Sequence, residues 1–173
     1  MEKQSFNISV FTENTVGILN RLTVVFTRRH INIHSITASE TEEEDVYRYT
    51  IVVTETEAQV KKVIGQLERQ IDVIRAFYHK DVDVVYQELA LVKVAFEPER
   101  MAELEGIIRA NNARLIAVTA EYVVFELTGH ESAIHALLQA LSAFDILEFS
   151  RSGRVAVTKP MKTLKTVIKE LTL

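Results

Sequence analysis

The stretch "ENTVGILNRL", residues 13–22, joins two segments of different periodicity. The segment before it, residues 5–11, alternates polar and apolar residues, which is typical of a strand. The segment after it, residues 19–29, repeats its apolar residues at helical spacing. A single glycine, Gly17, lies where the helix should begin. The stretch therefore predicts a strand-to-helix turn, and it raises the question of why that turn contains a glycine.

The periodicity continues from this turn in the order βαββαβ. The later strands are rich in β-branched and aromatic residues, and the second helix is amphipathic. Thr56 and Gln59 predict a capping box at the start of that second helix. The predicted strands of this half are residues 5–11, 31–40, 46–54 and 71–80, and the predicted helices are residues 16–29 and 57–70.

The same order of elements repeats after a short connection at residues 81–87. Asn111 and Asn112 are typical stop signals for the first helix of this second half. The predicted strands are residues 88–96, 113–120 and 121–129, with extended structure at 145–158, and the predicted helices are residues 98–112 and 130–144.

Two βαββαβ units predict an α+β protein with two ferredoxin-like domains, each with two helices on one face of a four-stranded antiparallel sheet. We expect one domain at residues 1–80 and a C-terminal ferredoxin-like domain at 84–159. Residues 160–173 have apolar residues at helical spacing and predict an amphipathic extension. The helix-free face of each sheet needs a cover, so we expect oligomerisation.

The composition excludes several classes of protein. The chain has no cysteine, which excludes disulfides and thiolate chemistry, and its net charge of −4 argues against phosphate-driven nucleic-acid binding. No run approaches the ~20 apolar residues of a membrane helix, and the first residues do not resemble a signal peptide. We therefore expect a cytoplasmic protein that binds neither nucleic acid nor membrane.

The sequence contains no recognisable catalytic or metal site. The spacing of the histidines does not let neighbouring pairs converge on one ion, and the acidic run at residues 40–45 lacks the alternating ligands of a calcium loop. Phosphate-binding glycine loops and nucleophile motifs are missing as well. We expect no catalytic residue and no metal ligand in this chain.

The turn at Gly17 has two interpretations from the residues alone. A helix N-terminus offers free N–H groups and partial positive charge, and a glycine lets a carboxylate approach the backbone. Asn14 adds a donor and an acceptor beside it. Alternatively, Gly17 serves only a tight turn and Asn14 only caps the helix. The local pattern leaves both interpretations open.

The wider sequence resembles the acetolactate synthase (acetohydroxyacid synthase) small subunit family. Its ACT domain carries E-N-x-x-G-x-L-x-R and then F-x-x-R-x-x-N-I-x-S-L, and this chain has "ENTVGILNR" and "FTRRHINIHSI". Further on, "QELALVKV" at 87–94 and "FSRSGRVAVTK" at 149–159 are similar to the start and the R-S-G-containing end of the family's second domain. The matching residues of the ACT motif are Glu13, Asn14, Gly17, Leu19, Arg21, Phe26, Arg29, Asn32, Ile33 and Ser35.

The resemblance implies that residues 1–80 form an ACT regulatory domain and that the chain has a regulatory role. Small subunits of this family bind a thiamine-diphosphate-dependent catalytic subunit, which forms 2-acetolactate from pyruvate. They activate it and confer feedback inhibition by branched-chain amino acids, usually valine. Thiamine diphosphate, magnesium and FAD are then expected on the catalytic partner and none in this chain. The implied partners are that catalytic subunit, a second copy of this chain in a homodimer through the ACT domains, and valine or another branched-chain amino acid.

The resemblance also implies where the effector binds. One chain supplies the turn, and its partner supplies the start of the second strand. A freestanding amino-acid sensor for another enzyme is the alternative, against which the R-S-G ending argues. A metal-responsive regulator is a weaker one, because no ligand set stands out. The expected effector-binding residues are Asn14, Gly17, Ile18 and Leu19 from one chain, with Asn32 and Ile33 from the other.

Overall fold

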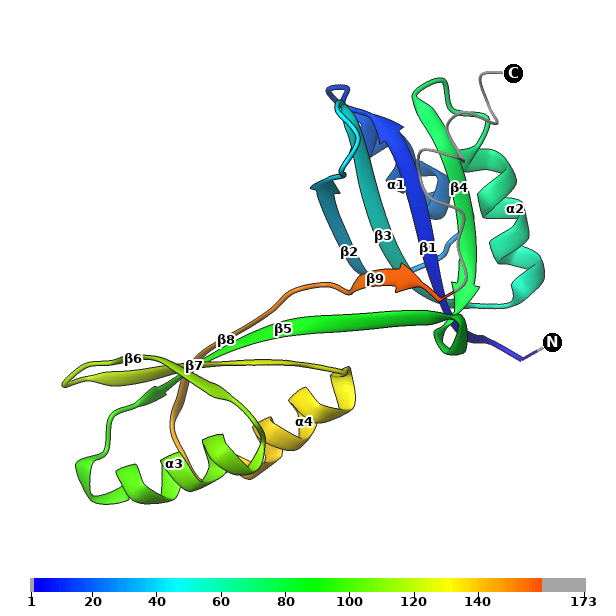
Figure 1. The fold of residues 1–173 in the computed structure, drawn as a ribbon. Coiled ribbons are helices and arrows are strands. Elements are labelled where there is room, and N and C mark those ends of the chain that lie inside the picture. Colours follow the sequence, from blue (N-terminus) through cyan, green and yellow to red (C-terminus); the bar gives the residue numbers. More distant parts are fainter. Residues whose placement is uncertain (1, 160–173) are drawn as a thin grey trace. The chain divides into compact units, whose positions relative to one another are not determined.

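The structure is a computed structural model that describes residues 2–159 (Figure 1). The described chain forms two compact units, one of residues 2–86 with 154–159 and the other of residues 87–153. Both units have the predicted βαββαβ order, so the predicted α+β class with two ferredoxin-like domains is confirmed. The amphipathic extension predicted for residues 160–173 lies outside the described residues.

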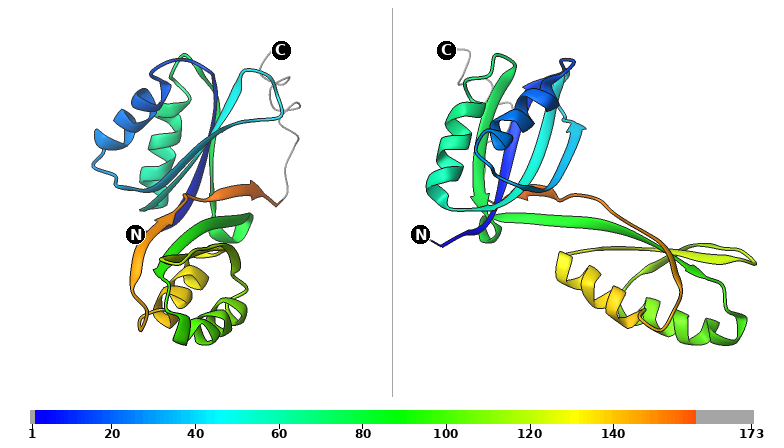
Figure 2. Two further views of the ribbon diagram at one scale, coloured as in Figure 1. Left: turned by 90° about the vertical axis from the view of Figure 1, so that its left-hand side faces the viewer. Right: turned by 180° about the vertical axis from the view of Figure 1, so that it is seen from behind.

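The first unit is a four-stranded antiparallel sheet in the order β2-β3-β1-β4. Both of its helices lie on one face of that sheet (Figure 2). Its elements are β1 (Gln4–Glu13), α1 (Ile18–Thr27), β2 (Ile33–Glu40), β3 (Val46–Glu55), α2 (Glu57–Leu67) and β4 (Val73–Lys80).

The core of the first unit lies between the sheet and its two helices. Alternate residues of each strand point to one face of a sheet, so every second residue of β1 and β3 faces the helices. The fully buried members include Phe6 and Ile8 from β1, Ile51 from β3, Leu22 from α1 and Leu67 from α2. Apolar burial of this kind, at about 25 cal/mol per Å², is the main force that holds the unit together.

The second unit repeats this topology in the strand order β6-β7-β5-β8. Its core residues alternate along β5 and β7 in the same way and pack against Leu104, Ile134 and Leu137 of the two helices. The elements are β5 (Val84–Ala95), η2 (Pro98–Arg100), α3 (Met101–Ala110), β6 (Arg114–Val118), β7 (Tyr122–Gly129), α4 (Glu131–Ala140) and β8 (Ile146–Arg151), and the 3-10 turn η1 (Asp81–Asp83) precedes β5.

Two predicted helix boundaries illustrate how well local signals work. The stop signal after α3 is confirmed, because Asn111 is the C-cap and Asn112 has the left-handed φ of 54°. The capping box at α2 is wrong in detail. Thr56 is the N-cap but its side chain makes no capping bond, and its N–H donates to the Glu55 carboxylate at 3.0 Å, where a capping box would use Gln59.

A ninth strand, β9 (Val155–Thr158), returns to the first unit and pairs with β5. Arg154 forms an ion pair with Asp81 at 2.9 Å, and its carbonyl accepts a hydrogen bond from Thr37 Oγ1 at 2.7 Å. Lys159 Nζ donates to the Val82 carbonyl at 2.7 Å. These contacts attach residues 154–159 to the first unit, and the second unit spans residues 87–153, which is shorter than the 84–159 that the sequence predicts.

Candidate functional site

The turn before α1 has the geometry that a glycine favours. Gly17 is the N-cap of α1 and has φ 82° and ψ 0°, the values of the third residue in a type II β-turn. The Ile18 N–H donates to the Thr15 carbonyl at 3.3 Å and closes that turn. A Cβ built on Gly17 would meet no atom of the described chain within 4 Å. The backbone angle, and not crowding inside this chain, is therefore what selects glycine here.

The N-terminus of α1 is chemically open. Gly17 provides no side-chain cap, and the first turn of α1 contains no acidic residue. Arg21, one turn further on, donates to Thr15 Oγ1 at 3.0 Å and forms an ion pair with Asp72. The helix dipole at this end is thus not neutralised by a carboxylate of its own first turn, which is a favourable setting for an anion.

Asn14 is exposed and lies beside the β2–β3 connection. Its backbone N–H donates to the Asp45 carbonyl at 3.0 Å. It lines a cavity of about 190 Å³ whose other lining residues include four acidic side chains: Glu40, Glu43, Glu44 and Asp45. Asn14 therefore links the turn to an acidic surface, which suits a cationic group better than an anionic one.

Ile18 and Leu19 have different surroundings. The Ile18 side chain is 4% exposed and belongs to the core of the first unit. The Leu19 side chain is 46% exposed, and Val16 beside the turn is fully exposed. Of Ile18 and Leu19, only Leu19 therefore presents its side chain to solvent.

Asn32 and Ile33 lie at the far end of the sheet from the turn. Glu13, at the end of β1, pairs with Val46, whereas Ile33 pairs with Val53. Seven positions along β3 separate these two levels, which corresponds to about 23 Å. A single chain thus does not bring the two halves of the predicted site together.

The β2 strand is nevertheless placed for intermolecular contact. It lies at the edge of the sheet and, within residues 2–159, pairs with β3 alone. Asn32 is exposed at its start, and Ile33 is half-buried. An edge strand offers unpaired N–H and C=O groups to another chain.

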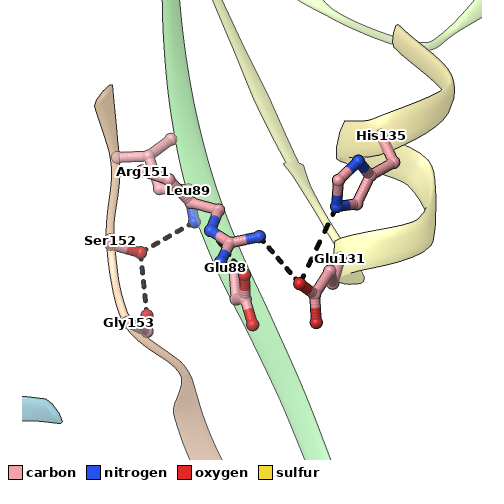
Figure 3. A network of polar contacts seen from close by, with 7 residues as sticks. All are labelled: Glu88, Leu89, Glu131, His135, Arg151, Ser152 and Gly153. Atoms are coloured by element: carbon pink, nitrogen blue, oxygen red, sulfur yellow. Dashed lines mark hydrogen bonds and ion pairs between the residues drawn. The ribbon is translucent and has the colours of Figure 1, made fainter. Parts of the chain in front are cut away.

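The R-S-G segment and the start of β5, two stretches that carry the family resemblance, lie side by side (Figure 3). Arg151 lies between Glu88, at 3.5 Å, and Glu131 of α4, at 3.2 Å. Ser152 makes two hydrogen bonds with the backbone of Leu89: its N–H donates to the Leu89 carbonyl at 2.8 Å, and its Oγ accepts the Leu89 N–H at 2.9 Å. The motif thus has a structural role in joining β5, β8 and α4 that its spacing did not reveal.

Residues 2–159 contain neither a cluster of metal-ligating side chains nor a helix suited to crossing a membrane. Among residues 2–159, no three histidine, aspartate or glutamate side chains are grouped so that they could hold a metal ion. None of the helices described has both the length and the apolar character needed to cross a bilayer.

Comparison with known proteins identifies both units. The ACT-domain model of the acetohydroxyacid synthase small subunit matches residues 8–75, and the model of the second domain, the small subunit of acetolactate synthase, matches residues 87–160. The acetolactate synthase small subunit of Bacillus subtilis is 38% identical over 88% of this chain and 89% of its own length. A probable small subunit from Archaeoglobus fulgidus is 34% identical over 90% of this chain and 97% of its own.

A solved structure agrees with these matches. The crystal structure of the acetolactate synthase small subunit from Thermotoga maritima aligns with a TM-score of 0.84 at 25% identity, covering 92% of this chain and 99% of its own. Sequence models, relatives and fold thus point to one assignment over nearly the whole chain. This protein belongs to the acetolactate synthase small subunit family.

Proposed function

We propose that this chain is the regulatory subunit of an acetolactate synthase. In this proposal it binds the thiamine-diphosphate-dependent catalytic subunit, raises its activity and makes it sensitive to valine or another branched-chain amino acid. Thiamine diphosphate, magnesium and FAD belong to the catalytic partner. Family membership supports this role, because the relatives are named as small subunits of that enzyme.

The observation that carries the effector site is the separation of its two halves. The turn with Asn14, Gly17 and Leu19 follows Glu13, whose level on β3 lies about 23 Å from that of Ile33. Within residues 2–159, no strand pairs with the outer edge of β2, which follows Asn32. This edge can therefore pair with another chain. A homodimer through the ACT domains brings the turn of one chain to the β2 start of its partner. The effector carboxylate then faces the uncapped N-terminus of α1.

The mechanism follows from linkage. An effector changes activity by the difference between its affinities for the activating and the non-activating dimer. A tenfold shift of that equilibrium needs about 1.4 kcal/mol of differential binding. One charge-assisted hydrogen bond that forms in one state only supplies about this amount.

The test is reconstitution with a catalytic subunit and an assay of acetolactate formation, with valine, leucine and isoleucine added in turn. Gly17→Asp places a carboxylate where the effector carboxylate would bind. We expect this variant to keep activation and to lose valine inhibition, with the half-inhibitory valine concentration raised at least tenfold.

Two control variants separate charge from strain. Gly17→Asn adds a side chain of the same shape without the charge, and asparagine tolerates the φ of 82° at this position. Gly65→Asp adds the same charge on the exposed face of α2, where a Cβ meets no atom within 4 Å. We expect Gly17→Asn to stay more sensitive to valine than Gly17→Asp, and Gly65→Asp to behave like the wild type. If Gly17→Asp kept full valine sensitivity, the proposed effector site would be wrong. If the wild-type chain changed neither the rate of acetolactate formation by the catalytic subunit nor its response to the amino acids, the proposed function would be wrong.

A further inference from the structure

A separate cavity lies on the helix-free face of the first sheet, under β9. It has a volume of about 380 Å³, which is room for a small metabolite. Phe11, Thr37 and Arg48 of the sheet line one side, and Val155 and Val157 of β9 line another. All of its lining residues belong to the first unit of one chain, so the cavity does not depend on a second copy.

Arg48 is the cation of this cavity. Its guanidinium lies 5.5 Å from the centre of the Phe11 ring, and its Nη2 donates to Ser9 Oγ at 3.1 Å. Its Nε is buried and has no hydrogen-bond partner among residues 2–159. Burial lowers the pKa of Arg48, and the nearby Glu42 carboxylate opposes that shift. A guanidinium stays protonated at neutral pH even when burial lowers its pKa. A buried N–H donor without a hydrogen-bond partner costs free energy, so a ligand that supplied an acceptor would be favoured.

The opposite charge lies at the rim. Glu42 also lines the cavity and is exposed, and its charge acts on Arg48. Glu40 pairs with Tyr47 across the strands and accepts a hydrogen bond from its hydroxyl at 2.9 Å, so its carboxylate lies on the helix-covered face of the sheet. A simple anion would gain Arg48 but would be repelled by the Glu42 carboxylate, and a simple cation would meet the reverse. A molecule with both charges satisfies the two ends of the cavity.

We propose that this cavity binds a small zwitterion of the amino-acid class. Its carboxylate accepts hydrogen bonds from the Arg48 guanidinium, and its ammonium lies against Glu42. The body of the ligand rests between Phe11 and the valines of β9. The site goes beyond the proposed effector site at Gly17, because it lies within one chain and shares none of the predicted effector residues.

The test uses the full chain labelled with ¹⁵N and glycine as the probe. The Nε–H signal of Arg48, assigned by its absence in Arg48→Lys, should shift saturably as glycine is added. Calorimetry should show glycine binding that weakens at least tenfold in Arg48→Met. Acetate, which lacks the ammonium, should bind at least tenfold more weakly than glycine, because the acidic rim no longer favours it.

Matched variants keep the result specific. Arg75→Met removes a guanidinium from the same face of the sheet, where Arg75 pairs with Phe11 across the strands and lies outside the cavity. It should bind glycine as the wild type does. Ala156→Leu fills the cavity from β9, where Ala156 is 4% exposed, and should abolish binding with Arg48 in place. This second variant covers the case in which Arg48→Met does not fold.

Gly17→Asp distinguishes this site from the proposed effector site. We expect it to leave the glycine response of Arg48 unchanged. Unaltered glycine binding in both Arg48→Met and Ala156→Leu, a missing response of the Nε–H signal, or acetate binding as tight as glycine binding would each overturn the proposal. A response that disappears in Gly17→Asp alone would overturn it too, and would assign the glycine to the turn.

Discussion

The two sheets share one topology but differ on their helix-free faces. In the first unit this face carries buried polar residues, with Asn7, Ser9 and Thr50 all less than 5% exposed. In the second unit the corresponding face exposes apolar side chains, with Leu89 at 39% and Leu91 at 40%. On the helix-free face of the same fold, polar side chains are therefore buried in the first unit and apolar side chains are exposed to solvent in the second.

The difference has a local cause. Arg154 and β9 return to the first sheet, where the Arg154 guanidinium contacts Asn7 Oδ1 at 3.3 Å and stacks over the Tyr86 ring at 4.1 Å. Asn7 thus has a hydrogen-bond partner in this segment, while Ser9 accepts a hydrogen bond from Arg48 of the sheet, and a polar group with a partner can be buried at little cost. The comparison shows that a ferredoxin-like sheet can cover its second face with a segment of its own chain.

The largest effect is expected from removing the cation that holds β9. Arg154, 6% exposed, pairs with Asp81, whose side chain is 39% exposed. Arg154→Met should lower the free energy of unfolding by about 2–3 kcal/mol, less than for a fully buried pair because Asp81 can rehydrate. Hydrogen exchange at the amides of β1 and β3 measures this.

Arg114→Met is the matched control for that change. Arg114 and Glu126 form an ion pair at 2.6 Å on the helix-free face of the second sheet, with Arg114 73% exposed. An exposed pair of this kind contributes about 0–1 kcal/mol. Equal losses in the two variants would contradict the idea that the covered face depends on β9.

A middle-sized effect is expected from truncating one apolar residue on each helix-free face. Val52 is 4% exposed on β3, and Leu91 is 40% exposed on β5. Val52→Ala should cost about 1.5–2.5 kcal/mol, because two buried methyl groups are lost and a cavity forms. Leu91→Ala should cost about 0.5 kcal/mol. Urea unfolding of the two variants compares them, and a larger loss for Leu91→Ala would mean that its face is covered.

The smallest effect is a pH dependence of the first unit. Burial lowers the pKa of His79 on β4 below its ordinary value, with the charge of Arg48 adding to the shift and Asp83 opposing it. The unfolded chain therefore takes up the proton more readily. This contribution to stability is present above about pH 6.5 and is lost as the pH falls through the lower folded pKa.

His79→Gln should make the fall in unfolding free energy between pH 7 and pH 5 shallower. Urea unfolding followed at amide signals of β1 and β3 measures the slope, and signals of β7 in the second unit serve as the internal reference. An unchanged slope at β1 and β3 would show that His79 does not contribute.

Much of the fold could be predicted because its signals are local. The alternation in β1 and β3 and the helical spacing in α1, α2, α3 and α4 each follow from one stretch of chain. The glycine turn belongs to the same group, since the φ of 82° at Gly17 is a property of four consecutive residues. The predicted bond from the Thr56 N–H to the Gln59 side chain does not form, because that N–H donates to the Glu55 carboxylate instead. A motif defined by fixed spacing does not include such a competing acceptor.

The candidate site could be predicted as a set of residues and not as an arrangement. The sequence placed Gly17 at a helix start, which is confirmed, and Asn32 at a strand start, whereas β2 begins one residue later at Ile33. Ile18 looked like Leu19 in the sequence, yet one side chain is in the core and the other in solvent. Burial depends on the face of α1 that meets the sheet, which only packing decides.

The sequence by itself determined the order of elements, the glycine turn and the family, because these depend on local spacing. Tertiary structure alone decided that Arg154 meets Asn7 and Asp81, that Arg151 lies between Glu88 and Glu131, and that Arg48 faces a cavity under β9. Each of these contacts joins residues far apart in the chain. These contacts form because apolar surfaces pack together and bring distant polar groups within hydrogen-bond distance. The periodicity of the sequence does not predict which polar groups are paired in this way.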